Sequence, residues 1–200
     1  MNQWLVAMVV VSVLWLPPAA GAAPTGKVII AQGVDPTSLD MTNQQEQPAS
    51  NVGAQMFEAL LERDQSLKLV PMLAAELPRL VAPTTWEVKL RRGVKFHNGE
   101  EFNADSVKFS LERLVNPANK LRGSSSFAPI DRVEIVDPYT VRVHTSKPWP
   151  TFVTVMTFRQ ASMYPPKAYA GKDSAFISKN PIGTGPYRLC LLYTSDAADE

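Results

Sequence analysis

The two histidines are the first residues to consider for chemistry, because a neutral imidazole can bind a metal or accept a proton. His97 stands before an Asn-Gly pair, and His144 lies far along the chain in an alternating segment. Neither has a second histidine three or four residues away or a cysteine beside it, so the ligand spacing of a closed metal site is missing. We therefore expect surface or half-buried histidines, and neither a metal nor a cofactor.

The possible nucleophiles also lack a catalytic setting. No serine stands in a G-x-S-x-G elbow, and Ser124–Ser126 follow Gly123 as in a flexible loop. Gly183-Thr184-Gly185 is not a phosphate loop, because it lacks the G-K-[ST] ending and Pro186 has no backbone N–H. We predict that the chain has no catalytic residue and is not an enzyme. The single cysteine, Cys190, excludes a disulfide within the chain.

A loop with two acidic residues is a better candidate for binding. It follows a short apolar strand predicted at Lys27–Gln32, and ligands gather at the carboxyl ends of strands in open α/β folds. The candidate ligand contacts are Asp35, Ser38, Asp40, Met41, Thr42 and Asn43. A second interpretation stays open, in which Pro36 and Ser38 shape a turn and the acids cap backbone amides.

The segment Trp86–Leu114, WEVKLRRGVKFHNGEEFNADSVKFSLERL, predicts a strand and a turn at its start. Trp86, Val88 and Leu90 alternate with charged residues, which is the period of a half-buried strand. Asn98-Gly99 then indicates a turn, because both residue types tolerate positive φ.

The second half of the same segment predicts a capped helix. Asn103 is a good N-cap, and Asp105 falls in the first turn, where the helix dipole favours negative charge. Val107, Leu111 and Leu114 share one helical face, which should be buried.

Prolines and polar turns outline the remaining elements. We expect a hairpin formed by Arg132–Val136 and Thr140–Thr145, and a strand at Tyr187–Leu189. The other predicted helices are Ser50–Leu61 with Ser50 as N-cap, Pro71–Leu77, Pro148–Phe158 and Pro166–Ala170.

The segment Trp86–Leu114 closely resembles the signature of the family 5 extracellular solute-binding proteins. These are the dipeptide, oligopeptide, glutathione and nickel receptors of bacterial ABC importers. Val28–Thr42, VIIAQGVDPTSLDMT, resembles the first strand of the family and the loop after it. Asn180–Leu189, NPIGTGPYRL, resembles its G-T-G-P-Y strand entry. The resemblance covers Lys27–Leu189.

The resemblance implies part of an α/β fold of the periplasmic-binding-protein type (type II, class C). Residues 23–61 and 182–189 would form the first part of one ligand-clasping lobe. Residues 62–181 would form an inserted α+β subdomain, and the second lobe would lie outside this chain. The loop at Asp35–Asn43 would face the cleft between the lobes.

The resemblance also implies the substrate-binding component of an ABC importer. Such a protein, expected as a monomer, closes over a peptide or related small solute and delivers it to membrane permease subunits. A periplasmic hydrolase or peptide-processing enzyme is an alternative that would need a catalytic motif. A ligand-binding module of a sensory system is a third interpretation, because the same cleft could serve it.

The charge of the chain argues against a nucleic-acid partner. The 20 Lys and Arg residues nearly balance the 19 Asp and Glu residues. A nucleic-acid-binding domain is usually basic, with its cations gathered in one patch. We therefore expect no nucleic-acid partner.

The N-terminus predicts export to the periplasm. Trp4–Leu16 is apolar except for Ser12 and is shorter than the about 20 residues that a membrane span needs. Pro17-Pro18 ends this run, and Ala20-Gly21-Ala22 supplies a small-x-small cleavage pattern, so residues 1–22 are predicted to be a signal peptide. Because no Lys or Arg precedes the apolar run, an uncleaved membrane anchor stays open as the alternative.

Residues 190–200, CLLYTSDAADE, do not continue the family pattern. That pattern would extend the strand and then place a tryptophan and a short turn. We expect a non-native tail here, and a genuine divergent C-terminus is the other interpretation.

The signal-peptide assignment predicts where the mature protein begins. Cleavage after Ala22 should give exported protein that starts at Ala23. N-terminal sequencing of the exported protein measures this directly. Recovery of an intact residue 1–22 segment in the membrane fraction would favour the anchor instead.

Overall fold

The computed structural model describes residues 30–190, and the structural statements below concern that part of the chain. From Gln32 onward these residues belong to one compact unit. The predicted signal peptide at residues 1–22 lies outside the described residues, and so does the predicted tail at 190–200 except for the exposed Cys190. The strand predicted at Lys27–Gln32 lies partly outside them, and residues 30–32 are not in a strand.

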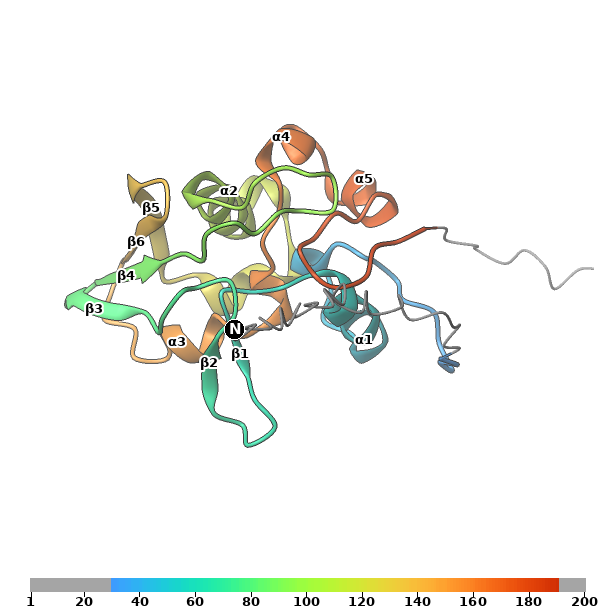
Figure 1. Cartoon of the computed structure of the whole chain (residues 1–200), viewed down its shortest axis with the longest axis horizontal. Helices are drawn as coiled ribbons and strands as arrows, with labels where there is room; N and C mark the ends of the chain where they lie inside the picture. The colour runs from blue at the N-terminus through green and yellow to red at the C-terminus, as the bar shows by residue number, and fades with distance from the viewer. Residues whose placement is uncertain (1–29, 191–200) are drawn as a thin grey trace, which may run out of the picture. The chain divides into compact units, whose positions relative to one another are not determined.

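The main sheet has four antiparallel strands in the spatial order β3–β4–β6–β5 (Figure 1). A separate two-stranded hairpin is formed by β1 and β2. The strands are β1 (Leu61–Arg63), β2 (Leu69–Pro71), β3 (Arg79–Ala82), β4 (Thr85–Lys89), β5 (Ile130–Asp137) and β6 (Thr140–Thr145). The turn between β5 and β6 has Pro138 after Asp137, so the predicted hairpin is confirmed.

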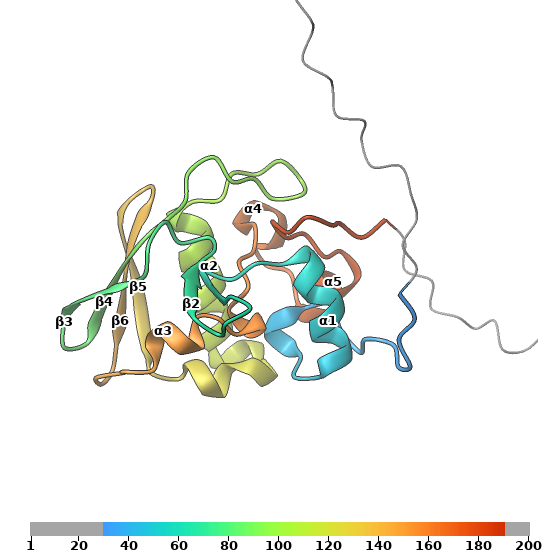
Figure 2. The same cartoon turned by 60° about the horizontal axis from the view of Figure 1, so that its bottom comes forward.

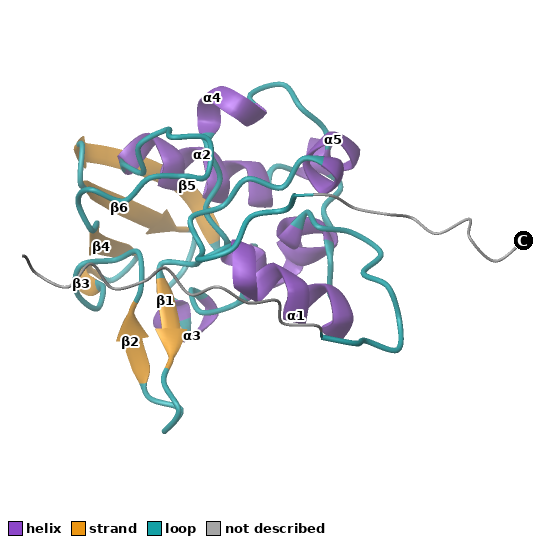
Figure 3. Ribbon diagram, turned by 45° about the vertical axis from the view of Figure 1, so that its right-hand side comes forward, coloured by secondary structure: helices purple, strands orange, loops and turns teal. Residues whose placement is uncertain are grey.

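Helices and irregular segments make up the rest of the described chain. The α-helices are α1 (Gln47–Met56), α2 (Ala104–Val115), α3 (Phe152–Val155), α4 (Pro166–Tyr169) and α5 (Ser174–Lys179). Four short 3₁₀ turns are η1 (Met41–Asn43), η2 (Pro117–Asn119), η3 (Arg122–Phe127) and η4 (Arg159–Ala161). Helix α2 lies between the sheet and helices α1 and α5, as Figure 2 and Figure 3 both show.

The signature segment folds as its sequence predicts. The side chain of Asn103 accepts hydrogen bonds from the amides of Asp105 and Ser106, and the Ser106 hydroxyl accepts from the Asn103 amide. This reciprocal capping box satisfies amides that would otherwise be unpaired at the start of α2. Gly99 has a φ of 86°, as the predicted turn requires.

The predicted inner faces of the strand and helix meet in the main core. Buried positions are Val88, Leu90, Val107, Leu111 and Leu114. Trp86 is only half-buried, because it lies at the edge of this core, where its ring stacks on Phe152 at a centroid distance of 4.9 Å.

Three predicted helices are wrong in their bounds or their existence. The helix predicted at Pro148–Phe158 covers only Phe152–Val155, because Pro150 disfavours a helical conformation at the residue before it. Helix α1 starts at Gln47 rather than at Ser50, because Pro48 occupies its first turn, where proline is favoured. It ends at Met56, since Phe57 is extended. The segment predicted as a helix at Pro71–Leu77 instead begins in a strand, because Leu69–Pro71 pairs with Leu61–Arg63.

The predicted strand at Tyr187–Leu189 is absent from the described part of the chain. Backbone hydrogen bonds instead join Gly185 to Met56 and Tyr187 to Gln55, at the C-terminal end of α1. The strand signal was the Tyr-Arg-Leu pattern, but these residues pair with a helix end and not with a neighbouring strand.

A smaller apolar cluster lies beside the main core. It joins the loop at Asp35–Asn43, called the first loop below, and the end of α1 to the segment from Tyr164 to α5. Its members are Leu39, Met41, Met56, Phe57, Tyr164, Tyr169 and Ile177. Within residues 30–190, no helix is both long and apolar enough to cross a membrane.

The burial of the α2 face predicts a large cost of truncation. Leu111 is fully buried, so Leu111→Ala should lower the free energy of unfolding by about 2–5 kcal/mol. Leu80 on β3 is 54% exposed, and Leu80→Ala is the matched control, with an expected change within about 0.5 kcal/mol. Urea unfolding of both variants measures the difference, and equal losses would show that the α2 face is assigned wrongly.

Candidate functional site

The first loop is organised around the buried carboxylate of Asp40, whose exposed fraction is 0%. Its Oδ1 accepts hydrogen bonds from the Thr42 hydroxyl at 2.6 Å and from the Thr42 amide at 3.3 Å. The Tyr164 hydroxyl donates to the same oxygen at 3.0 Å. Asp40 therefore caps η1 from within the core, where an unpaired carboxylate would be very costly.

The charge that balances Asp40 comes from Arg113 in α2. Its guanidinium is bidentate: Nη2 donates to Oδ2 at an N–O distance of 2.6 Å, and Nη1 donates to Oδ1 at 3.3 Å. It also donates to the Thr42 hydroxyl, and it lies 5.5 Å from the centroid of the Tyr164 ring. The Arg113 side chain is only 8% exposed, so this is a buried ion pair that joins α2 to the first loop.

Tyr164 completes the network. Burial, followed by the nearby negative charge of Asp40, raises the pKa of the Tyr164 phenol well above its ordinary value. The phenol therefore keeps its proton and donates a hydrogen bond to Asp40, while its oxygen accepts a hydrogen bond from the Thr42 amide at 3.3 Å. The backbone amide of Tyr164 in turn donates to Ser110 of α2 at 2.8 Å.

The six candidate ligand contacts fall into two groups. Asp40, Met41 and Thr42 are buried and form the inner side of the loop. Asp35 is exposed, and Ser38 and Asn43 are half-buried at the surface. The capping interpretation describes the geometry of Asp40, and Ser38 shapes the turn by accepting from the Asp40 amide at 3.1 Å.

Ser38 and Asn43 line a shallow hollow of about 570 Å³. Asn43 donates to the Ser174 hydroxyl at 2.9 Å, and the Leu39 amide donates to Ser178 at 2.9 Å, so α5 forms the opposite wall. The hollow is polar, and it also carries the opposite charges of Asp173 and Lys179.

A second hollow follows the exposed side of α1. Its lining is rich in neutral hydrogen-bonding groups and consists of Gln47, Ser50, Asn51, Ala54, Thr157, Phe158, Arg159 and Gln160. The Phe158 side chain is 40% exposed there. Amides, hydroxyls and the Arg159 guanidinium therefore surround an aromatic ring in this hollow.

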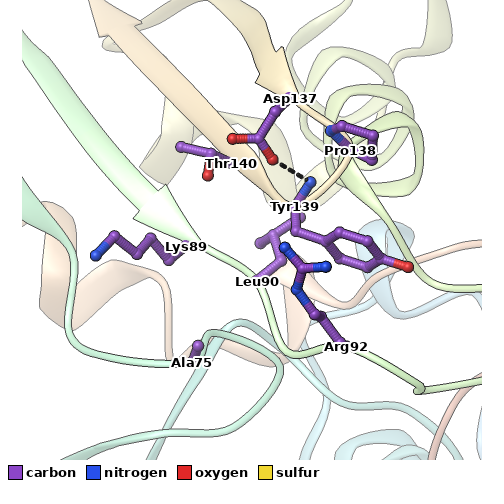
Figure 4. Close-up of a pocket in the computed structure, with 8 residues that line it drawn as sticks. All are labelled: Ala75, Lys89, Leu90, Arg92, Asp137, Pro138, Tyr139 and Thr140. Carbon is purple, nitrogen blue, oxygen red and sulfur yellow. Dashed lines mark hydrogen bonds between the residues drawn. The ribbon is translucent and has the colours of Figure 1, made fainter.

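A third hollow lies at the turn between β5 and β6 (Figure 4). Its two cations already have partners. The Arg92 guanidinium lies 4.5 Å from the centroid of the Tyr139 ring, and Lys89 is 3.1 Å from a Glu76 oxygen. These contacts pack the side chains of the hollow against the turn and its neighbours.

The histidines are half-buried, as expected, and lie in unrelated places. His97 is hydrogen-bonded to the Gly183–Gly185 segment, and His144 lies on the outward face of the sheet, 2.7 Å from Glu134. The hydrogen bond to His144 lowers the pKa of Glu134. Between residues 30 and 190, no three His, Cys, Asp or Glu side chains gather closely enough to hold a metal ion.

Sequence reasoning missed Arg113. Ser106, Ser110 and Arg113 are spaced i, i+4, i+7, directly beside the apolar stripe of α2, and all three are buried. A stripe of two small polar residues and one arginine next to an apolar stripe was the available signal. It indicates a helix buried on two faces, with the arginine needing an acidic partner.

Comparison with known proteins agrees with this fold. The sequence profile of the bacterial extracellular solute-binding proteins, family 5 Middle, matches residues 68–190. The glutathione-binding protein GsiB of Pectobacterium atrosepticum is 36% identical over 98% of this chain and 37% of its own length. GsiB of Salmonella choleraesuis is 33% identical over 94% of this chain and 36% of its length. The chain thus spans somewhat more than a third of these curated relatives.

Solved structures of the same kind superpose on the chain. NikZ from Campylobacter jejuni, in complex with Ni(L-His), has a TM-score of 0.67 at 31% identity, covering 72% of this chain and 29% of NikZ. Haemophilus influenzae OppA, in complex with the peptide RPPGFSPFR, has a TM-score of 0.72 at 29% identity, covering 80% of this chain and 35% of OppA. The α/β fold expected from the sequence is therefore that of periplasmic binding proteins.

The buried ion pair predicts a strong and coupled effect on stability. Arg113→Met leaves the Asp40 carboxylate unpaired in the core, so the free energy of unfolding should fall by about 3–5 kcal/mol. The double variant, Arg113→Met with Asp40→Asn, should lose less stability than the sum of the losses of the two single variants, because it no longer buries an unpaired charge. Urea unfolding of the four proteins in this cycle measures the coupling.

The matched control is Arg132→Met, which breaks an ion pair with Asp131 whose side chains are 61% and 56% exposed. Its expected cost is under about 1 kcal/mol. Additive costs for Asp40 and Arg113, or a cost of Arg113→Met as small as that of the control, would contradict the assignment.

Proposed function

Because the chain belongs to the bacterial extracellular solute-binding proteins of family 5, we propose that it acts in the periplasm as the solute-binding component of an ABC importer. The match of the family profile over residues 68–190 is the observation that carries this proposal. The related proteins are solute-binding proteins and not enzymes. The proposed partners are a small solute and the permease subunits of the importer, with the binding protein as a monomer.

Glutathione is the first ligand to test. The curated relatives that cover nearly the whole chain are named glutathione-binding proteins. At 36% identity the fold is shared, while the pocket can differ between relatives. Peptides and metal–histidine complexes, which the OppA and NikZ structures hold, are the alternatives.

The proposed mechanism is closure of two lobes over the solute. Residues 23–61 and 182–189 would supply part of the first lobe, and residues 62–181 the inserted subdomain. The second lobe would come from sequence outside this chain, which spans somewhat more than a third of its curated relatives. A solute drives closure only if it binds the closed form more tightly than the open form.

The first loop is the proposed contact with the solute. Asp35, Ser38 and Asn43 lie at the surface and would touch it. Asp40, Met41 and Thr42 are buried and would hold the loop in shape from behind. A carboxylate at Asp35 suits a solute that carries an ammonium group, as glutathione and peptides do.

The proposal predicts that tight binding needs both lobes. One wall of a cleft supplies only part of the contact surface, while the entropy lost on association remains. We expect no tight binding of glutathione by this chain alone. A chimaera of residues 1–189 with the remaining part of Pectobacterium atrosepticum GsiB should bind glutathione at micromolar concentration or below. Isothermal titration calorimetry of both proteins is the measurement.

A pair of charge variants tests the contact itself. In the chimaera, Asp35→Asn should weaken binding by about tenfold or more, whereas Asp131→Asn on the exposed end of β5 should leave it unchanged. Tight binding by the chain alone would overturn the two-lobe proposal. A folded chimaera that binds none of glutathione, peptides and nickel–histidine would overturn the proposed function.

A further inference from the structure

His97 fastens two segments that are far apart in sequence. Its backbone amide donates to the Gly183 carbonyl at 2.9 Å. Its ring lies between two further groups of the same segment, with Nδ1 3.3 Å from the Gly183 amide nitrogen and Nε2 2.8 Å from the Gly185 carbonyl oxygen. The turn at Asn98-Gly99 is thus joined to the G-T-G-P-Y segment by a single residue.

These two ring contacts determine the state of the imidazole. A backbone amide can only donate, so Nδ1 must carry a lone pair and no hydrogen. A carbonyl oxygen can only accept, so Nε2 must carry the hydrogen. Only the neutral Nε2–H tautomer of His97 satisfies both partners at once.

The other side of the segment is held by the end of α1. The Gly185 amide donates to the Met56 carbonyl at 2.9 Å, and the Tyr187 amide donates to Gln55 at 3.0 Å. These bonds satisfy carbonyls that the helix leaves unpaired at its C-terminal end. A Cβ on Gly183 would lie 2.0 Å from the Met56 oxygen, so the segment fits only because residue 183 is glycine.

We propose that His97 is an acid-sensitive fastener that holds Gly183–Gly185 against the C-terminal end of α1. Uptake of a second proton puts a hydrogen on Nδ1, which then meets the Gly183 N–H instead of accepting from it. The ring must turn away or the segment must move, and the hydrogen bond from the Gly183 amide to the ring is lost. The backbone bond from the His97 amide to the Gly183 carbonyl does not depend on this proton, and the neutral ring restores the bond to Nδ1.

The charged groups near this junction do not replace the bond. Glu101 accepts from the Tyr139 hydroxyl, and Glu100 accepts from the Lys167 amide at 3.0 Å. Within residues 30–190, no carboxylate is hydrogen-bonded to the His97 ring, so a second proton on the ring would form no ion pair with them. The charged residues on the elements that meet here are Glu58, Lys95, Glu100, Glu101, Lys167 and Arg188.

The functional meaning of this fastener rests on the proposed function. In that proposal Ile182–Leu189 returns the chain from the inserted subdomain to the first lobe, so acid would loosen the connection between them. The tautomer and the acid response belong to the chain itself, however, and they can be measured without any ligand.

The test is NMR spectroscopy of the full chain, labelled with ¹⁵N. At neutral pH the His97 ring should show hydrogen on Nε2 and none on Nδ1. As the pH falls, the Gly183 amide should shift with the same midpoint as the His97 ring, and its protection against hydrogen exchange should drop by about tenfold. A His144→Gln variant simplifies assignment, because His97 is then the one remaining histidine of the sequence.

Two variants separate the two ring contacts. His97→Asn places an acceptor near the Nδ1 position, so Gly183 should keep its protection and lose its pH step. His97→Gln places a donor near the Nε2 position, so Gly183 should lose protection at every pH. His144→Gln alone should leave the Gly183 amide unchanged. An Nδ1–H tautomer at neutral pH, or a Gly183 amide that ignores the titration of His97, would overturn the proposal whether or not the chain proves to belong to an importer.

Discussion

A carboxylate cannot stay ionised in a protein core without a partner, and Asp40 imposes this constraint on the described chain. Its partner, Arg113, lies on α2, so the buried position of the first loop depends on the position of α2. Tyr164 completes the set, since its phenol donates to Asp40 and its amide to Ser110 of the same helix. Three segments that are distant in sequence are therefore held in one mutual arrangement by a few directional bonds.

Helix α2 is the element through which this constraint reaches the sheet. One of its stripes is apolar and packs into the main core, and the neighbouring stripe of Ser106, Ser110 and Arg113 is polar and faces the first loop. Such a helix cannot slide or rotate without breaking one face or the other. The His97 junction adds a second connection, between the turn that precedes α2 and the G-T-G-P-Y segment. A binding protein that closes as rigid bodies needs connections of this kind within each body.

The sequence predicted most where local chemistry decides the structure. The capping box at Asn103, the turn at Gly99 and the apolar stripe of α2 depend on nearby residues, and all are present. Pro71–Leu77 was predicted wrongly because its pairing partner, Leu61–Arg63, is a tertiary contact that local signals do not show. The loop acids had two open interpretations for the same reason, because the burial of Asp40 depends on an arginine more than seventy residues away.

The central claim is that the Asp40 network makes the first loop part of the core. Hydrogen exchange at the Thr42 amide tests it most directly, because this amide donates to both Asp40 and Tyr164. If the network holds, Thr42 should exchange only when the whole unit unfolds, with the same opening free energy and the same denaturant dependence as Leu111 in α2. Exchange of Thr42 through a local opening that is independent of denaturant, while Leu111 stays protected, would contradict the account.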